Sequence, residues 1–372
     1  MLARVGLRRL PHPAGTRWLD LARILAIPAV VLIHVLVPVV LGRTTHFPSA
    51  AWWTAATLSS AARWCVPVFV MVSGALLLDP RRDTRLVPFL TRRLRRVGIP
   101  LVVWTAVYLL FQRYYLDTGL TLADARQAIY AGSPALQLYF LFIIVGLYLL
   151  TPFLRVFTIH ASWQRQAAFV VVFLGIGILD EALRALTDTG GVNAATRFLP
   201  YVGYYVAGWV LRDVVVSRRL VTIATVLFTG SIVLTTVGTR YLGGMRGINA
   251  AGLYLWDYLS PPVTTMSLSA FVLIRALAGR LPAIRDDRRA ARLRRVADLA
   301  FGVYLVHMLI LKPISHHVAI PAGALGTAGV TLAVWVVVVL ASGLVTRSRN
   351  VFPCYEQCSD PARGTRDVCR DR

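Results

Sequence analysis

The chain has 372 residues, of which 57% are hydrophobic and 15% charged, and its mean hydropathy of +0.64 is too high for a soluble domain of this length. The formal net charge of +23 would suit a nucleic-acid-binding protein if the basic residues shared one solvated surface with aromatic residues, but they lie in bursts between long apolar runs. We therefore expect a membrane protein with no nucleic-acid partner.

About ten apolar runs are long enough to cross a bilayer, which requires about 20 residues per helix. In chain order the predicted spans are 19–41, 56–78, 97–115, 136–157, 166–183, 197–211, 220–238, 258–278, 296–316 and 324–345. The first run is too long for the apolar core of a signal peptide, so we expect a retained helix. The sequence predicts an all-α, polytopic transmembrane bundle of about ten helices.

Arginine-rich segments alternate with acidic or neutral segments along the chain. Lys312 is the only lysine, so nearly all of the basic residues are arginines. The N-terminus and the segments 81–96 and 280–295 are arginine-rich and fall on one side of the alternation, which the positive-inside rule assigns to the cytoplasm. With ten spans, both termini are expected to be cytoplasmic. The shortest run, 197–211, is the one that could change the number of crossings.

The last residues differ in composition from the predicted membrane domain, 1–345. Residues 346–372 are polar and charged and show no helical period, so we expect a disordered cytoplasmic tail. Three of the four cysteines, Cys354, Cys358 and Cys369, lie there. No His–Cys cluster follows Cys358, and we predict no metal site.

One face of the first predicted helix carries two ionisable residues. Arg23 and His34 are eleven residues apart, which places them about 20° from the same direction and about 16.5 Å apart along the axis. Asp20 is close enough to pair with Arg23. An ionisable group at mid-bilayer costs about 2.5–3.5 kcal/mol or more and normally faces a polar interior. A structural His34, hydrogen-bonded to a neighbouring helix, would meet this requirement. Arg23 on the same helix face instead favours a catalytic His34 that accepts a proton.

Five motifs follow one another between residue 17 and about residue 310. They are the Arg23–His34 pair with ten residues between, Val66-Pro67 to Ser73-Gly74, Arg93-Leu94-Arg95-Arg96 with Pro100, Tyr139-Phe140-Leu141 with Tyr148 and Pro152, and the Gly-x-Tyr-x-x-His of Phe301 to His307. This ordered set resembles the acyltransferase-3 family of integral membrane acyltransferases. One departure is Tyr139, where the family usually has tryptophan.

The resemblance implies a multi-pass O-acyltransferase in the cell (inner or plasma) membrane. It implies cytoplasmic acyl-CoA, expected to be acetyl-CoA, as co-substrate, no bound cofactor, and an acceptor hydroxyl on a cell-surface polysaccharide or lipid-linked sugar. Arginines can hold the phosphates of CoA, and Arg23, Arg93 and Arg96 are the expected ones. His34 would take the proton of the acceptor hydroxyl or carry the acyl group itself, and both routes stay open.

Four further polar residues are candidates for acceptor binding or support of the site. Arg63 is costly within a predicted span. Ser73 either supports the site or, with the glycine after it, only allows close helix packing. Tyr304 and His307 share a helix face, and His307 either donates an interhelical hydrogen bond or supports the site.

Two other functions remain as alternatives. A glycan transporter or flippase without acyl transfer would also need buried polar residues, although the chain has no paired halves with broken helices. A catalytically silent scaffold would not need Arg23 and His34 in register. Most loop arginines are explained by membrane orientation, and Asp180-Glu181 by a solvated helix end. The sequence does not specify the oligomeric state.

Overall fold

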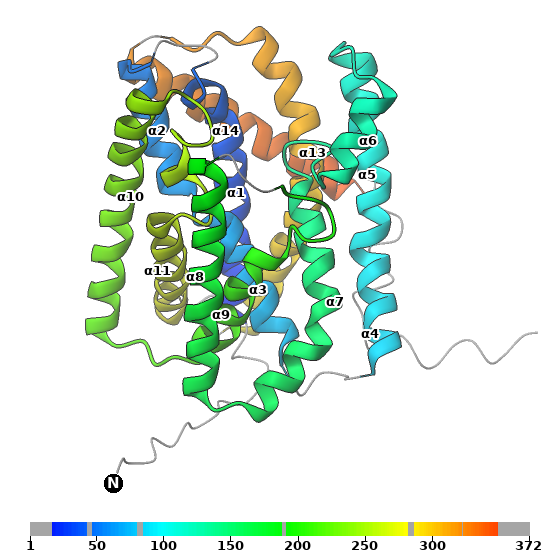
Figure 1. Ribbon diagram of the computed structural model, residues 1–372, viewed down its shortest axis with the longest axis vertical. Coiled ribbons are helices and arrows are strands. Elements are labelled where there is room, and N and C mark those ends of the chain that lie inside the picture. Colours follow the sequence, from blue (N-terminus) through cyan, green and yellow to red (C-terminus); the bar gives the residue numbers. More distant parts are fainter. Residues whose placement is uncertain are drawn as a thin grey trace, which may run out of the picture.

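The structure, a computed structural model, describes residues 17–42, 47–79, 85–187, 191–281, 286–321 and 323–348 (Figure 1). All regular structure in these ranges is helical. They contain eight helices or helix pairs that are long and apolar enough to cross a membrane, and α8 and α9 account for the other two predicted spans. The predicted all-α polytopic bundle is thus confirmed.

The longer helices run roughly along one axis of the molecule (Figure 1). In chain order the elements are α1 (Trp18–Val40), α2 (Ala50–Ala62), α3 (Cys65–Leu77), α4 (Leu86–Arg93), the π-helical turn η2 (Leu94–Gly98), α5 (Ile99–Leu110), the π-helical turn η3 (Phe111–Tyr115), α6 (Leu122–Tyr130), α7 (Tyr139–His160), α8 (Trp163–Thr187), the 3-10 turn η4 (Leu199–Tyr201), α9 (Val202–Arg212), α10 (Arg218–Arg246), the 3-10 turn η5 (Tyr254–Trp256), α11 (Pro261–Arg280), α13 (Asp287–His317) and α14 (Ala324–Arg347).

Two helices begin well before the apolar runs that predicted them. α4 begins at Leu86 and continues through η2 into α5, whereas the span was expected from residue 97, and α13 begins at Asp287 rather than 296. Arginine, leucine and alanine favour helix, while an apolar run marks only the part of a helix that lies in lipid. Arg93 and Arg96, expected in a loop, therefore lie on a continuous helix, and Arg96 is in the π-helical turn.

The predicted second span is a pair of helices with a break at Arg63. α2 begins at Ala50, where the Ser49 hydroxyl accepts a hydrogen bond from the backbone N–H of Trp52 at 3.1 Å. Arg63 follows the 13 residues of α2, and α3 begins at Cys65. Arg63 is thus farther from the start of the helix than the predicted span, 56–78, implied.

The connection between α8 and α9 folds back into the bundle. A Cβ atom on Gly177, near the middle of α8, would lie 2.8 Å from the carbonyl oxygen of Pro200, and one on Gly146 of α7 would overlap Phe198. The start of α9 is therefore held beside the middles of two membrane helices. With 11 residues α9 is about 16 Å long, too short to cross a bilayer alone, so the predicted span 197–211 is only partly helical.

Helices α3 and α9 approach each other at two glycines. A Cβ atom on Gly74 would lie 1.7 Å from the carbonyl oxygen of Tyr205, and one on Gly208 would lie 1.9 Å from that of Met71. Small residues allow such backbone approaches between membrane helices. Gly74 thus has the packing role considered for Ser73-Gly74, whereas the Ser73 side chain is partly exposed.

We expect Gly74→Ala and Gly208→Ala to lower the thermal unfolding midpoint of the detergent-solubilised protein. The added methyl group must push α3 and α9 apart, and overpacking of this kind costs about 1–3 kcal/mol. Gly175→Ala is the matched control, since nothing lies within 4 Å of a Cβ atom built there. Equal midpoints for Gly208→Ala and the control would contradict the close crossing.

Two buried arginines hold the C-terminal end of α3. The Arg155 Nε donates to the carbonyl oxygen of Leu77 at 2.6 Å, and the Arg212 Nη1 donates to that of Ala75 at 3.1 Å and to Asp79 Oδ2 at 3.2 Å. Arg155 lies near the end of the predicted span 136–157, and Arg212 directly follows the predicted span 197–211. Their burial follows from the unpaired carbonyl groups at a helix C-terminus, which attract cations.

The last helix crosses the bundle obliquely (Figure 1). The Trp335 Nε1 donates to the carbonyl oxygen of Pro28 at 2.7 Å, and Thr346 contacts Gly302, the midpoint of α13. The start of the predicted tail, 346–347, belongs to α14. Residues 349–372, with the rest of that tail and its three cysteines, lie outside the described residues.

Candidate active site

A large cavity lies along α1, inside the bundle. Its volume is about 1950 Å³, roughly twice the upper end of the 300–1,000 Å³ typical of small-molecule sites. Its lining on α1 extends from Arg17 to Leu41, about 36 Å at 1.5 Å per residue, which exceeds the roughly 30 Å of a bilayer core. The helix face that carries Arg23 and His34 therefore lines the cavity near both ends of α1, although no residue between Arg23 and Val30 contributes to the lining.

One end of the cavity, the arginine end, is strongly basic. Its charged lining residues are Arg17, Asp20, Arg23, Arg92, Arg93, Arg96, Arg155, Asp287, Arg294 and Asp298. Ion pairs join Arg23 to Asp20 at 3.1 Å and Arg17 to Asp287 at 2.5 Å. Seven arginines against three aspartates leave a net positive charge at this end, which suits a polyanionic ligand.

The arginines around η2 differ in the direction that they face. Arg93 and Arg96 are half-buried and line the cavity, whereas Arg95 is exposed and lies on the outer surface. The Arg93 guanidinium carbon lies 5.8 Å from the ring centroid of Tyr148 on α7. π-Helical turns frequently occur at functional sites. Only one face of this arginine-rich segment, the face with Arg93 and Arg96, therefore lines the cavity.

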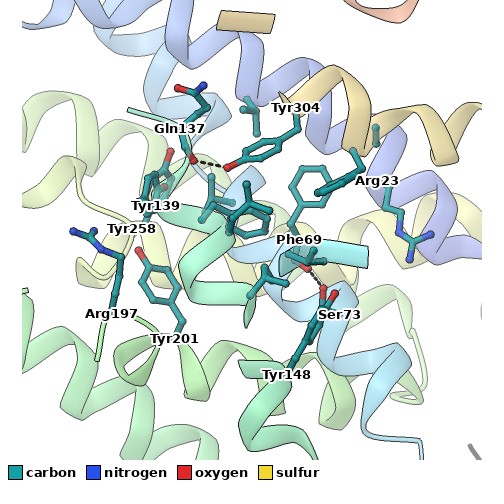
Figure 2. A pocket seen from close by; sticks show the side chains of 18 of the residues that line it. Arg23, Phe69, Ser73, Gln137, Tyr139, Tyr148, Arg197, Tyr201, Tyr258 and Tyr304 are labelled. Carbon is teal, nitrogen blue, oxygen red and sulfur yellow. Dashed lines mark hydrogen bonds between the residues drawn. The ribbon is translucent and has the colours of Figure 1, made fainter. Parts of the chain in front are cut away.

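The other end, the aromatic end, combines aromatic rings with charged groups. It contains Arg63, Tyr139, Asp180, Glu181, Arg184, Arg197, Tyr201, Trp256, Asp257 and Tyr258. The Arg63 guanidinium carbon lies 3.3 Å from the ring centroid of Trp256 and 4.6 Å from that of Tyr258. Figure 2 shows Tyr139, Arg197, Tyr201 and Tyr258 together on one side and Arg23 on the other, with Phe69 between them.

Glu181 contradicts the expectation of a solvated helix end at Asp180-Glu181. Glu181 is buried and paired with Arg184, and both carboxylates line the cavity. The chain between α8 and α9 covers this part of α8, which no local pattern in the sequence could indicate.

Ser73, Tyr304 and His34 line the middle of the cavity. The Ser73 hydroxyl donates to the carbonyl oxygen of Phe69 at 3.0 Å, and the Tyr304 hydroxyl donates to that of Gln137 (Figure 2). The His34 Nδ1 is buried and has no hydrogen-bond partner among the described residues. Its Nε2 is therefore the ring nitrogen that faces the cavity, at the position that a proton acceptor requires.

His307 does not line the cavity but lies behind His34. Its side chain is fully buried, and the ring centroids of the two histidines are 5.1 Å apart. The His307 Nδ1 bonds to the carbonyl oxygens of Val303 and Tyr304 at 3.1 and 2.7 Å. Both acceptors belong to the preceding turn of α13, so this nitrogen makes no interhelical hydrogen bond.

Several lining residues were missed by sequence analysis. Trp256 and Asp257 lie in a connection just before the predicted span 258–278, and Arg155, near the end of the predicted span 136–157, was given no role. One signal could have found the first group: a buried arginine such as Arg63 requires partners, and neighbouring connections rich in aromatic residues are the natural source. Which aromatic residues contact Arg63 depends on the fold and could not be predicted from the sequence.

Fold and cavity together define a multi-pass membrane protein with an ionisable pair facing an interior cavity. A family model described as "Acyltransferase domain" matches residues 16–347. The chain belongs to this acyltransferase-3 family, as its five motifs indicate. No curated protein and no solved structure matches the chain.

Proposed function

We propose that this acyltransferase moves an acyl group, acetyl in the simplest case, from cytoplasmic acyl-CoA to a hydroxyl of a cell-surface polysaccharide or lipid-linked sugar. Its membrane would be the inner or plasma membrane. The observation that carries the proposal is the cavity that joins a basic end to an aromatic end, with His34 between them.

The arginine end is the proposed donor site. Guanidinium groups form bidentate, charge-assisted hydrogen bonds with phosphates, and Arg93, Arg96 and Arg23 lie at the mouth of the cavity. Arg23 and His34 are about 16.5 Å apart along α1. CoA phosphates held at this end would let the flexible pantetheine arm bring the thioester along α1 to His34.

His34 is the proposed general base. Its Nε2 takes the proton of the acceptor hydroxyl while that oxygen forms a bond to the thioester carbonyl carbon. The carbon–sulfur bond then breaks, and the CoA thiolate leaves with the proton from His34. The products are the acyl ester and free CoA. Acyl transfer through His34 itself is the second route, and a labelled acyl-histidine intermediate would reveal it.

The aromatic end is the proposed acceptor site. Sugar rings present apolar faces that can stack on lining aromatic rings such as Tyr258, and their hydroxyls can donate to the carboxylates of Asp180 and Asp257. Arg63 fixes the rings of Trp256 and Tyr258 through its stacking contacts.

We expect Arg63→Lys to raise the KM for the acceptor by about 10-fold. Lysine keeps the charge but loses the planar group that stacks on Trp256, and a desolvated cation–π contact is worth about 2 kcal/mol. The KM for acetyl-CoA should not change. Arg246→Lys, at an exposed position of α10 outside the cavity, is the control. An unchanged acceptor KM would remove Arg63 from the acceptor site.

The direct test uses purified protein in detergent with acetyl-CoA labelled in its acetyl group and a panel of glycans. We expect label on a glycan together with one free CoA per transfer. A glycan transporter would release no CoA and leave the glycan unlabelled. That outcome, with well-folded protein and across the panel, would overturn the proposed function.

A further inference from the structure

His34 and His307 form a buried pair of adjacent rings, and each ring has one nitrogen without a hydrogen-bond partner. The Nδ1 of His34 and the Nε2 of His307 are buried, and neither has a hydrogen-bond partner among the described residues. The two rings lie 5.1 Å apart, centroid to centroid, with planes tilted by 39°. Buried polar atoms are rarely left without partners, so two such atoms on adjacent rings need an explanation.

The contacts of His307 determine where its proton lies. The Nδ1 of His307 meets two backbone carbonyl oxygens, which accept hydrogen bonds and cannot donate them. Nδ1 must therefore carry the proton. In a neutral imidazole the other nitrogen is then an acceptor, so the Nε2 of His307 has a lone pair that accepts no hydrogen bond from a described residue.

A lone pair beside His34 has a consequence for the tautomer of that histidine. A proton on the Nδ1 of His34 can be given to the Nε2 of His307 as a hydrogen bond, whereas a proton on the Nε2 of His34 would leave a lone pair without a donor on both of the buried nitrogens. The first tautomer leaves the cavity-facing Nε2 of His34 unprotonated. This is the form that a general base requires.

We propose that His307 is a positioning residue that accepts a hydrogen bond from the Nδ1–H of His34 and so holds the Nε2 of His34 ready to take a proton from substrate. The inference rests on the proposed function, because His34 is its base. When Nε2 takes the acceptor's proton, His34 becomes an imidazolium, and the same hydrogen bond becomes charge-assisted and stronger.

The separation of the rings fits this role. A hydrogen bond of about 2.9–3.0 Å between ring nitrogens, added to the two ring radii, spans about the 5.1 Å seen between centroids. The structure contains no hydrogen bond between these two rings, and catalytic hydrogen bonds often tighten only when substrate binds. Arg63 and Lys312 are the other charged groups that act electrostatically on His34, and both stay in place in the variants below.

Two substitutions at His307 separate the positioning role from a structural one. His307→Gln places a side-chain oxygen where Nε2 was and keeps an acceptor for His34. His307→Asn places an amide where Nδ1 was, so it keeps the contact with the backbone of α13 and loses that acceptor. We expect His307→Asn to lower kcat about 10²-fold with the KM for acetyl-CoA unchanged, and His307→Gln to recover at least about a tenth of wild-type kcat.

A higher kcat for His307→Asn than for His307→Gln would overturn the inference. If His307 only anchors α13, asparagine restores activity and glutamine does not. If both variants keep wild-type kcat, His34 does not need the acceptor. Both variants should be compared for thermal unfolding midpoint, so that a kcat loss is read only from folded protein.

A spectroscopic readout tests the pair without relying on acyl transfer. In protein labelled with ¹⁵N-histidine, the His34 signals, assigned by their loss in His34→Ala, should show a protonated Nδ1 and a bare Nε2 in wild type. His307→Asn should shift the population toward the other tautomer, and His307→Gln should not. A wild-type tautomer protonated at Nε2 would refute the inference, whereas a correct tautomer with no acyl transfer would refute only the proposed function.

Discussion

Replacing His34 by glutamine should lower kcat for acyl transfer by about 10²–10⁴-fold, the range that a general base contributes. Glutamine has a size and polarity close to those of histidine, but its amide cannot accept a proton at neutral pH. Its effect on acetyl-CoA binding should be small, because the proposed donor site lies about 16.5 Å away along α1. Initial rates with labelled acetyl-CoA at saturating acceptor measure the loss.

The control for His34 lies on the same helix. Leu25 is 36% exposed and does not line the cavity, so Leu25→Ala should keep kcat within about twofold. Should His34→Gln keep wild-type kcat, His34 would be neither the general base nor an acyl carrier. His34→Ala should behave as His34→Gln does, provided that its unfolding midpoint matches.

Removal of Arg96 should raise the KM for acetyl-CoA by about 10- to 100-fold and leave kcat nearly unchanged. Hydrogen bonds to charged groups contribute about 1.5–3 kcal/mol, and each 1.4 kcal/mol is a factor of ten in affinity. Arg93→Ala should act in the same direction. The effect should shrink as the salt concentration rises, because screening already weakens the wild-type interaction.

Arg95 gives a matched control within the same turn. It is exposed and lies outside the cavity, so Arg95→Ala removes the same charge without a donor contact. If all three alanine variants raised KM equally, general positive charge at this surface would explain the effect. If none did, the donor site would lie elsewhere.

The sequence predicts the membrane spans and the face of α1 because both depend on local patterns. Eight of the ten apolar runs correspond to helices or helix pairs of the described residues that are long enough to cross a membrane. The eleven-residue spacing of Arg23 and His34 places them on one side of any regular helix. The structure adds that this side lines a cavity. The roles of the two residues stay a proposal.

Features that depend on contacts between distant segments could not be predicted. His34 and His307 belong to separate motifs, and no spacing rule connects α1 with α13. The break at Arg63 has a local signal in Pro67, which lacks the N–H that would bond to the carbonyl oxygen of Arg63, but Pro28 lies within α1 and does not break it. The close contact of Pro200 with Gly177, one turn of α8 before the buried Glu181, also joins segments far apart in sequence.

The predicted starts of helices that extend beyond the lipid were wrong for a different reason. Apolar runs locate the bilayer core, but α4 and α13 extend into arginine-rich sequence that is helical by propensity. The structure also shows α6 between the predicted spans 97–115 and 136–157, where Thr121 and Asp124 form a capping box. Hydrogen bonds from Thr121 lower the pKa of Asp124.

The sidedness of the reaction tests most directly whether one cavity joins a cytoplasmic donor to an acceptor on the opposite face. The protein should be reconstituted into vesicles in known orientation, with the acceptor glycan trapped on the side away from the arginine end. Labelled acetyl-CoA added at the arginine end should label the trapped glycan, and His34→Gln should abolish the signal. Labelling only when acetyl-CoA and glycan share one side, or only from the aromatic end, would contradict the account.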